Sequence, residues 1–586
     1  MLKIFRHLSR REWIMIATSL AFIVAQVWLD LKLPDYMAEI TRLVQTPGSK
    51  MSAIWTQGTY MLLCALGSMA SAIIVGFLAS RIGTGFSRRL RSKLFDKVGS
   101  FSMGEINKFS TPSLITRSTN DVTQVQMLVT MGLQMIVKAP ILAVWAIIKI
   151  SGKGTEWSVA TVIAAGAVVI MLALLLVFVI PKFRKMQTLT DNINKVTREN
   201  LTGLSVVRAY NAEPYQTAKF ERANKELTDT QLFTGRGMAI MWPMMGFIMS
   251  TLTLSIYIIG ALLINGASGF DRLTIFSNMV VFSAYAIQVI MAFMMMAMLF
   301  VFLPRATVAA RRINEVMDTQ PTILGGQRDA APSNGLRGHV EFRNVSFKYP
   351  NAANYILHDI NFTAKAGETV AFIGSTGSGK SSLINLIPRF FDATDGEILI
   401  DGVNVKDYTL HALNNKLGYV PQKAVMFSGT VSSNVAFGER AGQDHTEDEI
   451  KRAVKIAQGK SFVEKMDGEY QSEIARDGKN VSGGQKQRLA IARAVARNPE
   501  IYIFDDSFSA LDYRTDRALR TAIKKETKGS TNLIVAQRIG TIRDADKIVV
   551  LDEGKVVGTG THDQLMKSCK VYKEIAMSQL TEEELA

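Results

Sequence analysis

Residues 369–381 read Thr-Val-Ala-Phe-Ile-Gly-Ser-Thr-Gly-Ser-Gly-Lys-Ser, and this stretch determines how the second half of the chain folds. The apolar run 369–373 predicts a buried strand, and the apolar residues after Ser381 predict a helix. Between them, glycines let backbone N–H groups turn toward a phosphate without a side chain in the way. Strand, glycine-rich loop and helix in this order predict a P-loop, which binds nucleotide phosphates.

The residues of this loop that are predicted to bind nucleotide form one continuous set: Gly374, Ser375, Thr376, Gly377, Ser378, Gly379, Lys380, Ser381 and Ser382. Lys380 is expected to reach the β- and γ-phosphates, and the Ser381 hydroxyl is expected to bind Mg²⁺. The cofactors that we expect are therefore ATP and Mg²⁺. The alternative is a glycine- and serine-rich turn without a ligand.

A second apolar strand ends in two acids, Asp505 and Asp506. In P-loop proteins an aspartate at the end of a neighbouring strand holds Mg²⁺, so Asp505 is the expected metal ligand together with Ser381. Alone, the acidic pair would also fit a helix cap after a buried strand. Beside a P-loop, the metal site is the favoured interpretation.

Apolar runs of strand length recur through the second half, separated by polar or amphipathic stretches. They are 340–347, 369–373, 397–400, 500–504, 532–536 and 547–551. This alternation predicts an α/β nucleotide-binding domain over residues 338–586.

A further anion site is predicted at residues 481–485, Val-Ser-Gly-Gly-Gln, where two glycines follow a serine at the start of a helix. Backbone N–H groups at such a helix start bind phosphate. Because the P-loop already provides one phosphate site, a second one suggests that it serves a different nucleotide.

The first half contains long runs without charged residues. Four are uninterrupted, 51–80, 157–181, 237–270 and 273–304, and two are less clean, 13–29 and 122–148, the latter with Lys138. Each uninterrupted run exceeds the roughly 20 residues that span a bilayer. The predicted spans are therefore about 13–33, 57–80, 127–149, 157–181, 238–264 and 274–303. Buried core helices of a soluble protein are the alternative.

The connections between these spans differ in length and charge. The long ones, 81–121 and 182–236, hold the basic residues, so the positive-inside rule places them and both termini in the cytoplasm of a multi-pass membrane protein, with a bacterial plasma membrane as the expected location. We expect the long connections to be membrane helices that continue into the cytosol; disordered loops are the alternative. The membrane domain is thus predicted over 1–304 and a linker over 305–337.

Composition agrees with this division. The 586 residues are 48% hydrophobic and carry 67 Lys plus Arg against 51 Asp plus Glu, a net charge of +16. Apolar content of this size excludes a disordered chain. With only two cysteines, Cys64 and Cys569, a disulfide framework is excluded. Nucleic acid is not an expected partner, because the basic residues flank membrane spans.

Together these motifs resemble the ATP-binding cassette (ABC) family over the whole chain. The resemblance implies an all-α membrane domain of six helices with long cytosolic extensions, followed by an α/β cassette, as in an exporter half-transporter. It implies that Tyr349 stacks on adenine and that Gln422 contacts Mg²⁺. It implies that the signature motif consists of Ser482, Gly483, Gly484 and Gln485. It also implies that residues 509–512 form the D-loop.

The resemblance also implies a head-to-tail pair of cassettes, in which each ATP lies between one chain's P-loop and the other chain's signature. This arrangement explains the second anion site. Short coupling helices are implied at the tips of the cytosolic loops, at about 110–117 and 212–220.

Of the positions that depart from the family pattern, two carry the most information. The glutamate that activates water is replaced by Asp506, and the switch histidine is replaced by Gln537. Aspartate is one methylene shorter, and a misplacement of about 1 Å can cost on the order of 100-fold in rate. Glutamine carries no titratable proton. A third departure, Arg476 in place of a cross-talk glutamate, puts that contact in doubt.

These departures predict a site that binds ATP but hydrolyses it slowly, with Asp506 as a degenerate general base and Gln537 as a degenerate switch. A homodimer would contain two such sites, and a heterodimer one. We therefore expect a second half-transporter, with intact glutamate and histidine, as partner. The intact signature of this chain would complete the partner's site.

The expected cargo is a hydrophobic drug or lipid-like compound, because flexible methionines suit varied apolar ligands. Methionines gather in two spans: Met238, Met241, Met244, Met245, Met249, Met291, Met294, Met295, Met296 and Met298. Ordinary helix packing is the alternative. Lys138 and Asp30 are functional candidates as ionisable groups near the membrane, with snorkelling as the alternative for Lys138.

Two other functions fit the same motifs. One is peptide export, and the other is a regulatory or channel-type subunit that binds ATP without hydrolysing it.

Overall fold

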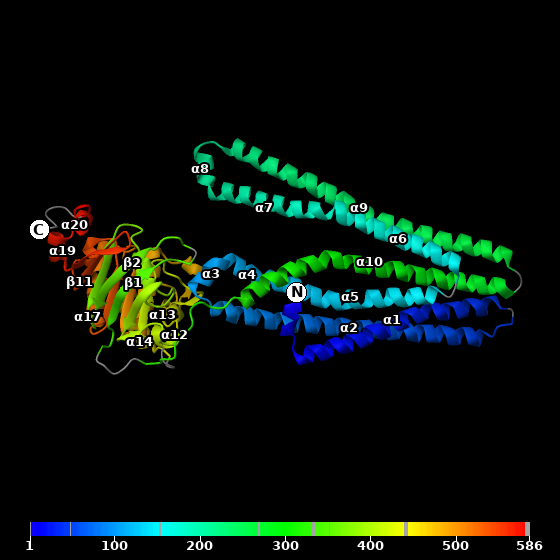
Figure 1. Ribbon diagram of the computed structural model, residues 1–586, viewed down its shortest axis with the longest axis horizontal. Coiled ribbons are helices and arrows are strands. Elements are labelled where there is room, and N and C mark those ends of the chain that lie inside the picture. Colours follow the sequence, from blue (N-terminus) through cyan, green and yellow to red (C-terminus); the bar gives the residue numbers. More distant parts are fainter. Residues whose placement is uncertain are drawn as a thin grey trace. The chain divides into compact units, whose positions relative to one another are not determined.

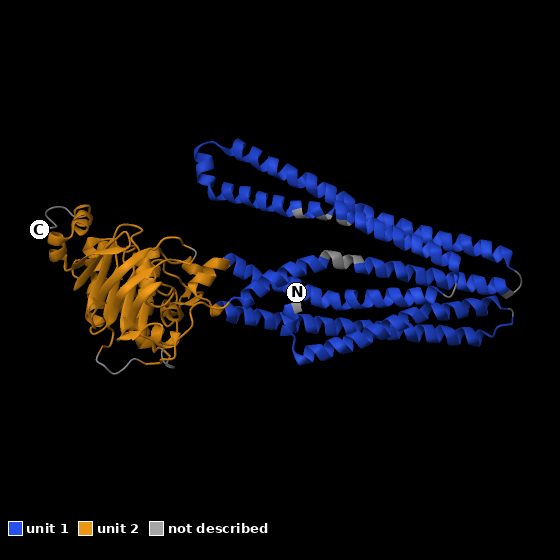
Figure 2. Cartoon of the chain, viewed as in Figure 1, with its two compact units in different colours: residues 1–98, 112–319 blue, residues 99–111, 320–586 orange. Residues whose placement is uncertain are grey.

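The computed structural model describes residues 2–46, 48–151, 154–267, 270–330, 336–350, 352–438 and 444–579, without the side chains of 2, 176, 180, 184, 270 and 297–301. The chain forms two compact units (Figure 2). Residues 1–98 and 112–319 make up the helical unit, and residues 99–111 and 320–586 the α/β unit. Part of the expected linker, 331–335, lies outside the described residues.

Helices build the first unit. They are α1 (Arg10–Gln45), α2 (Met51–Gly99), α4 (Thr111–Thr116), α5 (Val122–Ile150), α6 (Thr155–Phe178), α7 (Ile180–Thr202), α8 (Leu204–Ala209), α9 (Glu213–Gly266) and α10 (Phe270–Asp318), with a π-helical turn at Arg117–Asp121 and a 3-10 turn at Leu2–His7. Within the described residues, six helices are long and apolar enough to cross a membrane. The predicted six-helix membrane domain is therefore confirmed.

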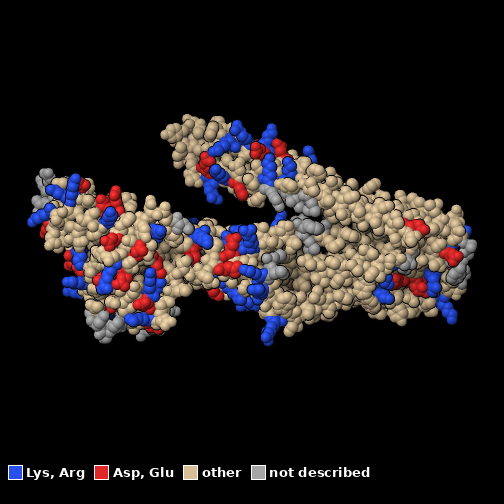
Figure 3. All heavy atoms as spheres, in the orientation of Figure 1, with Lys and Arg blue, Asp and Glu red and all other residues tan. Residues whose placement is uncertain are grey.

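The face of the helical unit drawn in Figure 3 has a broad middle region without Lys, Arg, Asp or Glu. The long connections are helical, as expected: α2 continues to Gly99 and α9 begins at Glu213. Helices α7 and α9 run side by side, and α8 joins them at their tip (Figure 1).

Local boundaries differ from the expectations at two places and agree at a third. Helix α8 precedes the segment 212–220, which instead forms the first turns of α9. The segment 110–117 largely coincides with α4, and it follows α3 (Met103–Phe109), a helix of the α/β unit. Helix α10 continues to Asp318, so the first part of the expected linker is helical.

Strands of the α/β unit form three sheets within the described residues. The largest has the order β12-β11-β3-β10-β9-β6, parallel except for β12; a second, antiparallel sheet has the order β2-β1-β4-β5; and β7 pairs with β8. The strands are β1 (Val340–Phe347), β2 (Leu357–Ala364), β3 (Thr369–Gly374), β4 (Asp395–Ile400), β5 (Val403–Asn404), β6 (Leu417–Val420), β7 (Gly429–Thr430), β8 (Glu473–Ile474), β9 (Ile501–Asp505), β10 (Thr531–Val535), β11 (Lys547–Asp552) and β12 (Lys555–Gly560).

The helices that follow β3 in this unit are α11 (Lys380–Asn385), α12 (Leu410–Asn415), α13 (Val431–Val435), α14 (Glu447–Ile456), α15 (Lys460–Val463), α16 (Gly483–Arg497), α17 (Tyr513–Glu526), α18 (Ile539–Ile542), α19 (His562–Ser568) and α20 (Lys570–Met577). One face of the parallel sheet packs against helices that include α16, α17 and α20, and the other face packs against the antiparallel sheet together with α11 and α12. Successive residues of β3 alternate between two cores: Val370 and Phe372 pack in one, Ala371 and Ile373 in the other. A strand buried on both faces reads as a continuous apolar run.

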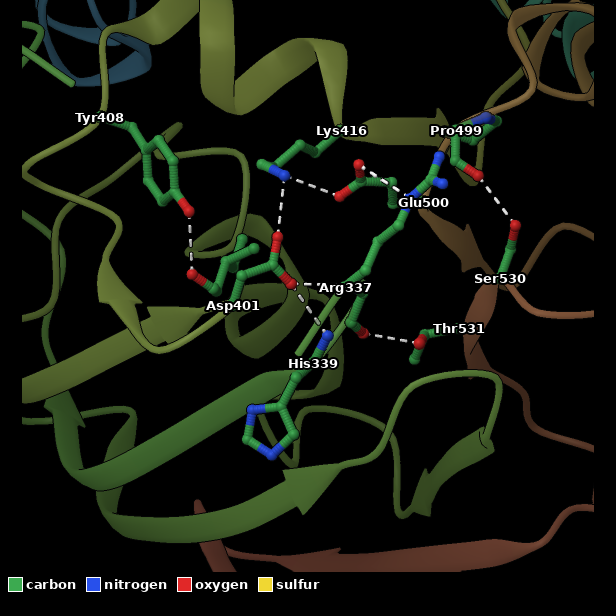
Figure 4. A network of polar contacts seen from close by, with 11 residues as sticks. Arg337, His339, Asp401, Tyr408, Lys416, Pro499, Glu500, Ser530 and Thr531 are labelled. Atoms are coloured by element: carbon green, nitrogen blue, oxygen red, sulfur yellow. Dashed lines mark hydrogen bonds and ion pairs between the residues drawn. The ribbon is translucent and has the colours of Figure 1, made fainter. Parts of the chain in front are cut away.

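A buried ion network holds the start of β1 to both larger sheets (Figure 4). The Nζ of Lys416 lies 2.8 Å from an oxygen of Asp401 and 2.7 Å from one of Glu500. Asp401 in turn accepts hydrogen bonds from the backbone N–H groups of Gly338 and His339. Burial lowers the pKa of Lys416, but the hydrogen bonds to both carboxylates outweigh it, so that pKa is raised above its ordinary value.

Replacing Lys416 with methionine is expected to destabilise the α/β unit by about 3–5 kcal/mol, because the buried Asp401 loses this counter-ion and Glu500 keeps only its pair with the exposed Arg337. With a raised lysine pKa, this stabilisation is fully present below the unfolded pKa of about 10.4 and is lost only as the pH rises through the folded value. Chemical unfolding of the full chain at pH 7 measures the effect. The control is Arg343→Met, because Arg343 forms exposed pairs and should cost less than about 1 kcal/mol. Equal midpoints for the two variants would contradict the prediction.

Candidate functional site

The glycine-rich loop lies between β3 and α11, as the sequence predicts. Gly377 and Gly379 have φ values of +87° and +94°, which favour glycine. Lys380 is buried, and its Nζ donates to the carbonyl oxygens of Gly374 at 2.8 Å and Ser375 at 2.7 Å. Burial lowers the pKa of Lys380, and Asp506 and Asp505 oppose that shift. The ammonium thus lies against the loop that the sequence assigns to phosphate.

Asp505 ends β9 and meets the first turn of α11. The hydroxyl of Ser381 donates to Asp505 Oδ1 at 2.9 Å. Burial raises the pKa of Asp505, and the neighbouring Asp506 raises it further, while Ser381 and Lys380 lower it. A buried carboxylate of this kind is suited to a cation, and hydroxyl and carboxylate oxygens are ligands that Mg²⁺ prefers. The residues therefore fit the expected metal.

Two glutamine side chains donate hydrogen bonds to the same carboxylate oxygen of Asp506. Its Oδ2 accepts a hydrogen bond from Gln537 Nε2 at 2.8 Å and from Gln422 Nε2 at 3.3 Å. The backbone of Asp506 has φ +45°, a conformation that aspartate adopts more readily than most residues. Burial raises the pKa of Asp506, against the hydrogen bonds from the glutamines. The structure therefore brings together the two positions that depart from the family pattern.

Gln579, which follows α20, holds the loop after β10 in place. Its Nε2 donates to the carbonyl oxygen of Gln537 at 2.7 Å, and its Oε1 accepts from the N–H of Ile539 at 2.9 Å. Sequence reasoning missed this residue, because nothing in the local pattern links it to a loop some 40 positions away.

Tyr349 lies just after β1 and contacts the P-loop helix. Its hydroxyl is 2.9 Å from the Ser382 hydroxyl, and its ring packs edge-on against Phe391 with centroids 5.0 Å apart. Phe391 was not predicted as part of the site. These contacts fix the ring of Tyr349 beside the nucleotide-binding loop.

The signature residues form the start of α16. Ser482 caps the helix: its Oγ accepts from the N–H of Gln485, and its own N–H donates to Gln485 Oε1. A Cβ at Gly483 would meet no atom within 4 Å, whereas one at Gly484 would lie 3.4 Å from the oxygen of Ala510. Among the described residues, no hydrogen bond or ion pair joins this set to the P-loop set. Arg476 is exposed, 3.8 Å from Asp477.

Ion pairs connect the membrane-spanning helices. Lys138 of α5 lies 3.3 Å from Asp30 of α1, and Asp30 also accepts a hydrogen bond from Ser68 of α2. A second pair, Lys149 with Asp35 at 2.7 Å, was not predicted. Lys138 and Asp30 therefore have each other as partners.

Comparison with known proteins gives consistent matches. The model of the ABC transporter transmembrane region matches residues 15–293, and that of the ABC transporter matches residues 357–509. An uncharacterized ABC transporter ATP-binding protein of Mycobacterium tuberculosis is 39% identical, covering 88% of this chain and 87% of the relative. An ATP-dependent lipid A-core flippase of Pseudomonas aeruginosa is 30% identical, covering 89% and 85%. The solved structure of a bacterial Atm1-family ABC exporter with ATP bound covers 98% of this chain and 100% of its own, with a TM-score of 0.79 at 24% identity, and this likeness shows the fold.

A helical membrane domain joined to an ATP-binding α/β domain defines an ATP-driven translocase. The chain belongs to the ABC transporter family. It is a multi-pass membrane protein with one ABC transmembrane region and one ATP-binding domain.

Proposed function

We propose that this chain is the degenerate-site subunit of a heterodimeric ABC exporter. It binds ATP on its own P-loop, hydrolyses it slowly, and supplies its signature to the partner's site. The observation that carries the proposal is the 2.8 Å hydrogen bond between Gln537 and Asp506, at the two positions where a histidine and a glutamate are expected.

The side chains at these positions explain why hydrolysis would be slow. The Asp506 carboxylate is one methylene shorter than glutamate, and its Oδ2 is already engaged by the amides of Gln537 and Gln422. General-base assistance is worth roughly 100- to 10,000-fold when the base is correctly placed. An amide cannot take up or release a proton as imidazole does.

This chain has residues suited to each part of a bound Mg²⁺–ATP. Lys380 would reach the phosphates, Tyr349 would stack on adenine, and Ser381, Asp505 and Gln422 would hold Mg²⁺. Bound Mg²⁺ would neutralise negative charge on the phosphates. ATP held in this way would keep two cassettes engaged, while hydrolysis at the partner's site resets the transporter between its inward and outward states.

A hydrophobic drug or lipid-like compound is the proposed cargo. Met238 and Met244 of α9 are exposed in the single chain. A groove of about 1070 Å³ between α6 and α9 is lined mainly by apolar residues such as Met171, Phe178 and Phe247. The similarity to a lipid A-core flippase points in the same direction. Met298 lies outside the described side chains.

The proposed location is the bacterial plasma membrane, with both termini in the cytoplasm.

Unequal contributions of the two ATP sites test the proposal. In the purified heterodimer, Asp506→Ala is expected to lower the ATPase rate less than about threefold, since this carboxylate contributes little to hydrolysis. Replacing the partner's catalytic glutamate by alanine is expected to lower the rate by at least about 100-fold. Steady-state phosphate release measures both rates. Equal losses from the two substitutions would contradict the asymmetry.

A further inference from the structure

A basic groove of about 890 Å³ lies between α17 and α18 of the α/β unit, and none of its lining residues belongs to the ATP-binding set. The lining is strongly cationic: Arg517, Arg520, Lys524, Lys525, Lys528 and Arg543. Among the described lining residues, Asp544 is the one acid. Such a concentration of like charge attracts an anionic ligand or segment.

Only part of this charge is neutralised. Arg520 lies 3.0 Å from Asp516 and also donates to the carbonyl oxygen of Thr541, which ties α17 to α18. Arg517, Lys524 and Lys528 form no ion pair with any carboxylate in the described part of the chain. The groove is thus a fixed surface with cations that lack close counter-ions.

The chain itself reaches the rim of this groove. Gln579 is hydrogen-bonded to the N–H of Ile539, the residue before Gly540 and Thr541, which line the groove. Residues 580–586, which lie outside the described part of the chain, read Leu-Thr-Glu-Glu-Glu-Leu-Ala. Three consecutive glutamates, Glu582 to Glu584, therefore lie three to five positions after Gln579, which is held by its hydrogen bonds.

The acidic segment is long enough to reach the basic residues along α17. At up to 3.6 Å per residue, Glu582 can lie as far as about 11 Å from Gln579, and Glu584 about 18 Å. The stretch of α17 from Arg517 to Lys525 is about 12 Å long at 1.5 Å per residue. The acidic segment can therefore extend along the cations of α17 without any change in the described fold.

We propose that the acidic segment 580–586 docks in the basic groove of its own chain. The anchor at Gln579, the charge complementarity and the short span favour this occupant over an anionic lipid or free phosphate. Because Gln579 also bonds the backbone of Gln537, docking restrains the loop that presents Gln537 to Asp506. The acidic segment therefore acts as a positioning element for the switch loop. This docking is independent of the proposed heterodimer.

Carbodiimide cross-linking of the full-length protein in detergent, followed by mass spectrometry, tests the docking. Amide links are expected between Glu582, Glu583 or Glu584 and Lys524, Lys525 or Lys528. When isotopically light and heavy chains are mixed before cross-linking, the linked peptides should be light–light or heavy–heavy, which shows that the links form within one chain. The variant K524E/K528E should lose at least about 80% of them, and adding E582K/E584K should restore them. The control K365E/K406E makes the same charge change outside the groove and should leave them intact.

Hydrogen exchange provides a second readout that does not need cross-links. In a variant that ends at Gln579, the peptide containing Ile539 should exchange about fivefold faster than in the full chain, because its anchor is less restrained. Unchanged exchange together with absent links would overturn the proposal. Links found only between light and heavy chains, or links that survive K524E/K528E, would overturn it as well.

Discussion

Replacing Asp506 with glutamate and Gln537 with histidine in the same chain is expected to raise the ATP turnover of the purified chain by about 10- to 100-fold. Glutamate restores the missing methylene, so the carboxylate can approach the attacking water. Histidine restores a group that can carry a proton and a positive charge. Both replaced side chains already meet at 2.8 Å, so the change concerns one local cluster. Phosphate release in lipid nanodiscs measures the gain.

The control for this gain adds Lys380→Ala to the double variant. Lys380 is expected to contact the phosphates, so turnover should fall to background if the gain arises at this P-loop. Each single substitution should give a smaller gain than the pair, because the two side chains act on the same water and phosphate. An unchanged rate in the double variant would show that Asp506 and Gln537 do not limit hydrolysis.

Gly483→Asp in the signature is expected to lower the ATPase rate of the complete two-chain complex by at least about 100-fold. The start of α16 carries a partial positive charge and backbone N–H groups suited to a phosphate, and a carboxylate there repels the partner's nucleotide. A Cβ at Gly483 meets nothing within 4 Å, so the fold of this chain should be unaffected. ATP binding to the P-loop of this chain should stay within about twofold of the parent.

Gly483→Ala separates charge from size in that experiment. It fills the same open space without a negative charge, so we expect a loss below about tenfold. If Gly483→Asp lowered ATP binding on the P-loop of its own chain as much as it lowered hydrolysis, the signature would not be serving a second chain.

Local patterns in the sequence predicted the parts of the fold that depend on local physics. Uncharged runs predicted the membrane helices, because a bilayer excludes charge. The apolar run of β3 and the glycines after it predicted the P-loop, whose conformation depends on Gly377 and Gly379. Strand β2 was not predicted, because two consecutive exposed polar residues, His358 and Asp359, interrupt its apolar pattern.

Other features depend on contacts between distant parts of the chain. No spacing rule connects the residues of two such contacts: the hydrogen bond from Gln579 to the carbonyl oxygen of Gln537, and the ion pair between Lys149 and Asp35. The extension of α10 could have been found, because Ala306, Ala310 and Ile313 recur at helical spacing and are buried. The glycines and prolines that indicated a linker begin only after Asp318, where the helix ends.

Identification of the partner in native membranes tests the proposed heterodimer most directly. The tagged chain would be purified from the membranes of its own cells in mild detergent, and the proteins that co-purify in a 1:1 ratio would be identified by mass spectrometry. We predict a second half-transporter with glutamate and histidine at the positions of Asp506 and Gln537. Recovery of this chain paired only with itself, with ATP turnover typical of ABC exporters, would contradict the account.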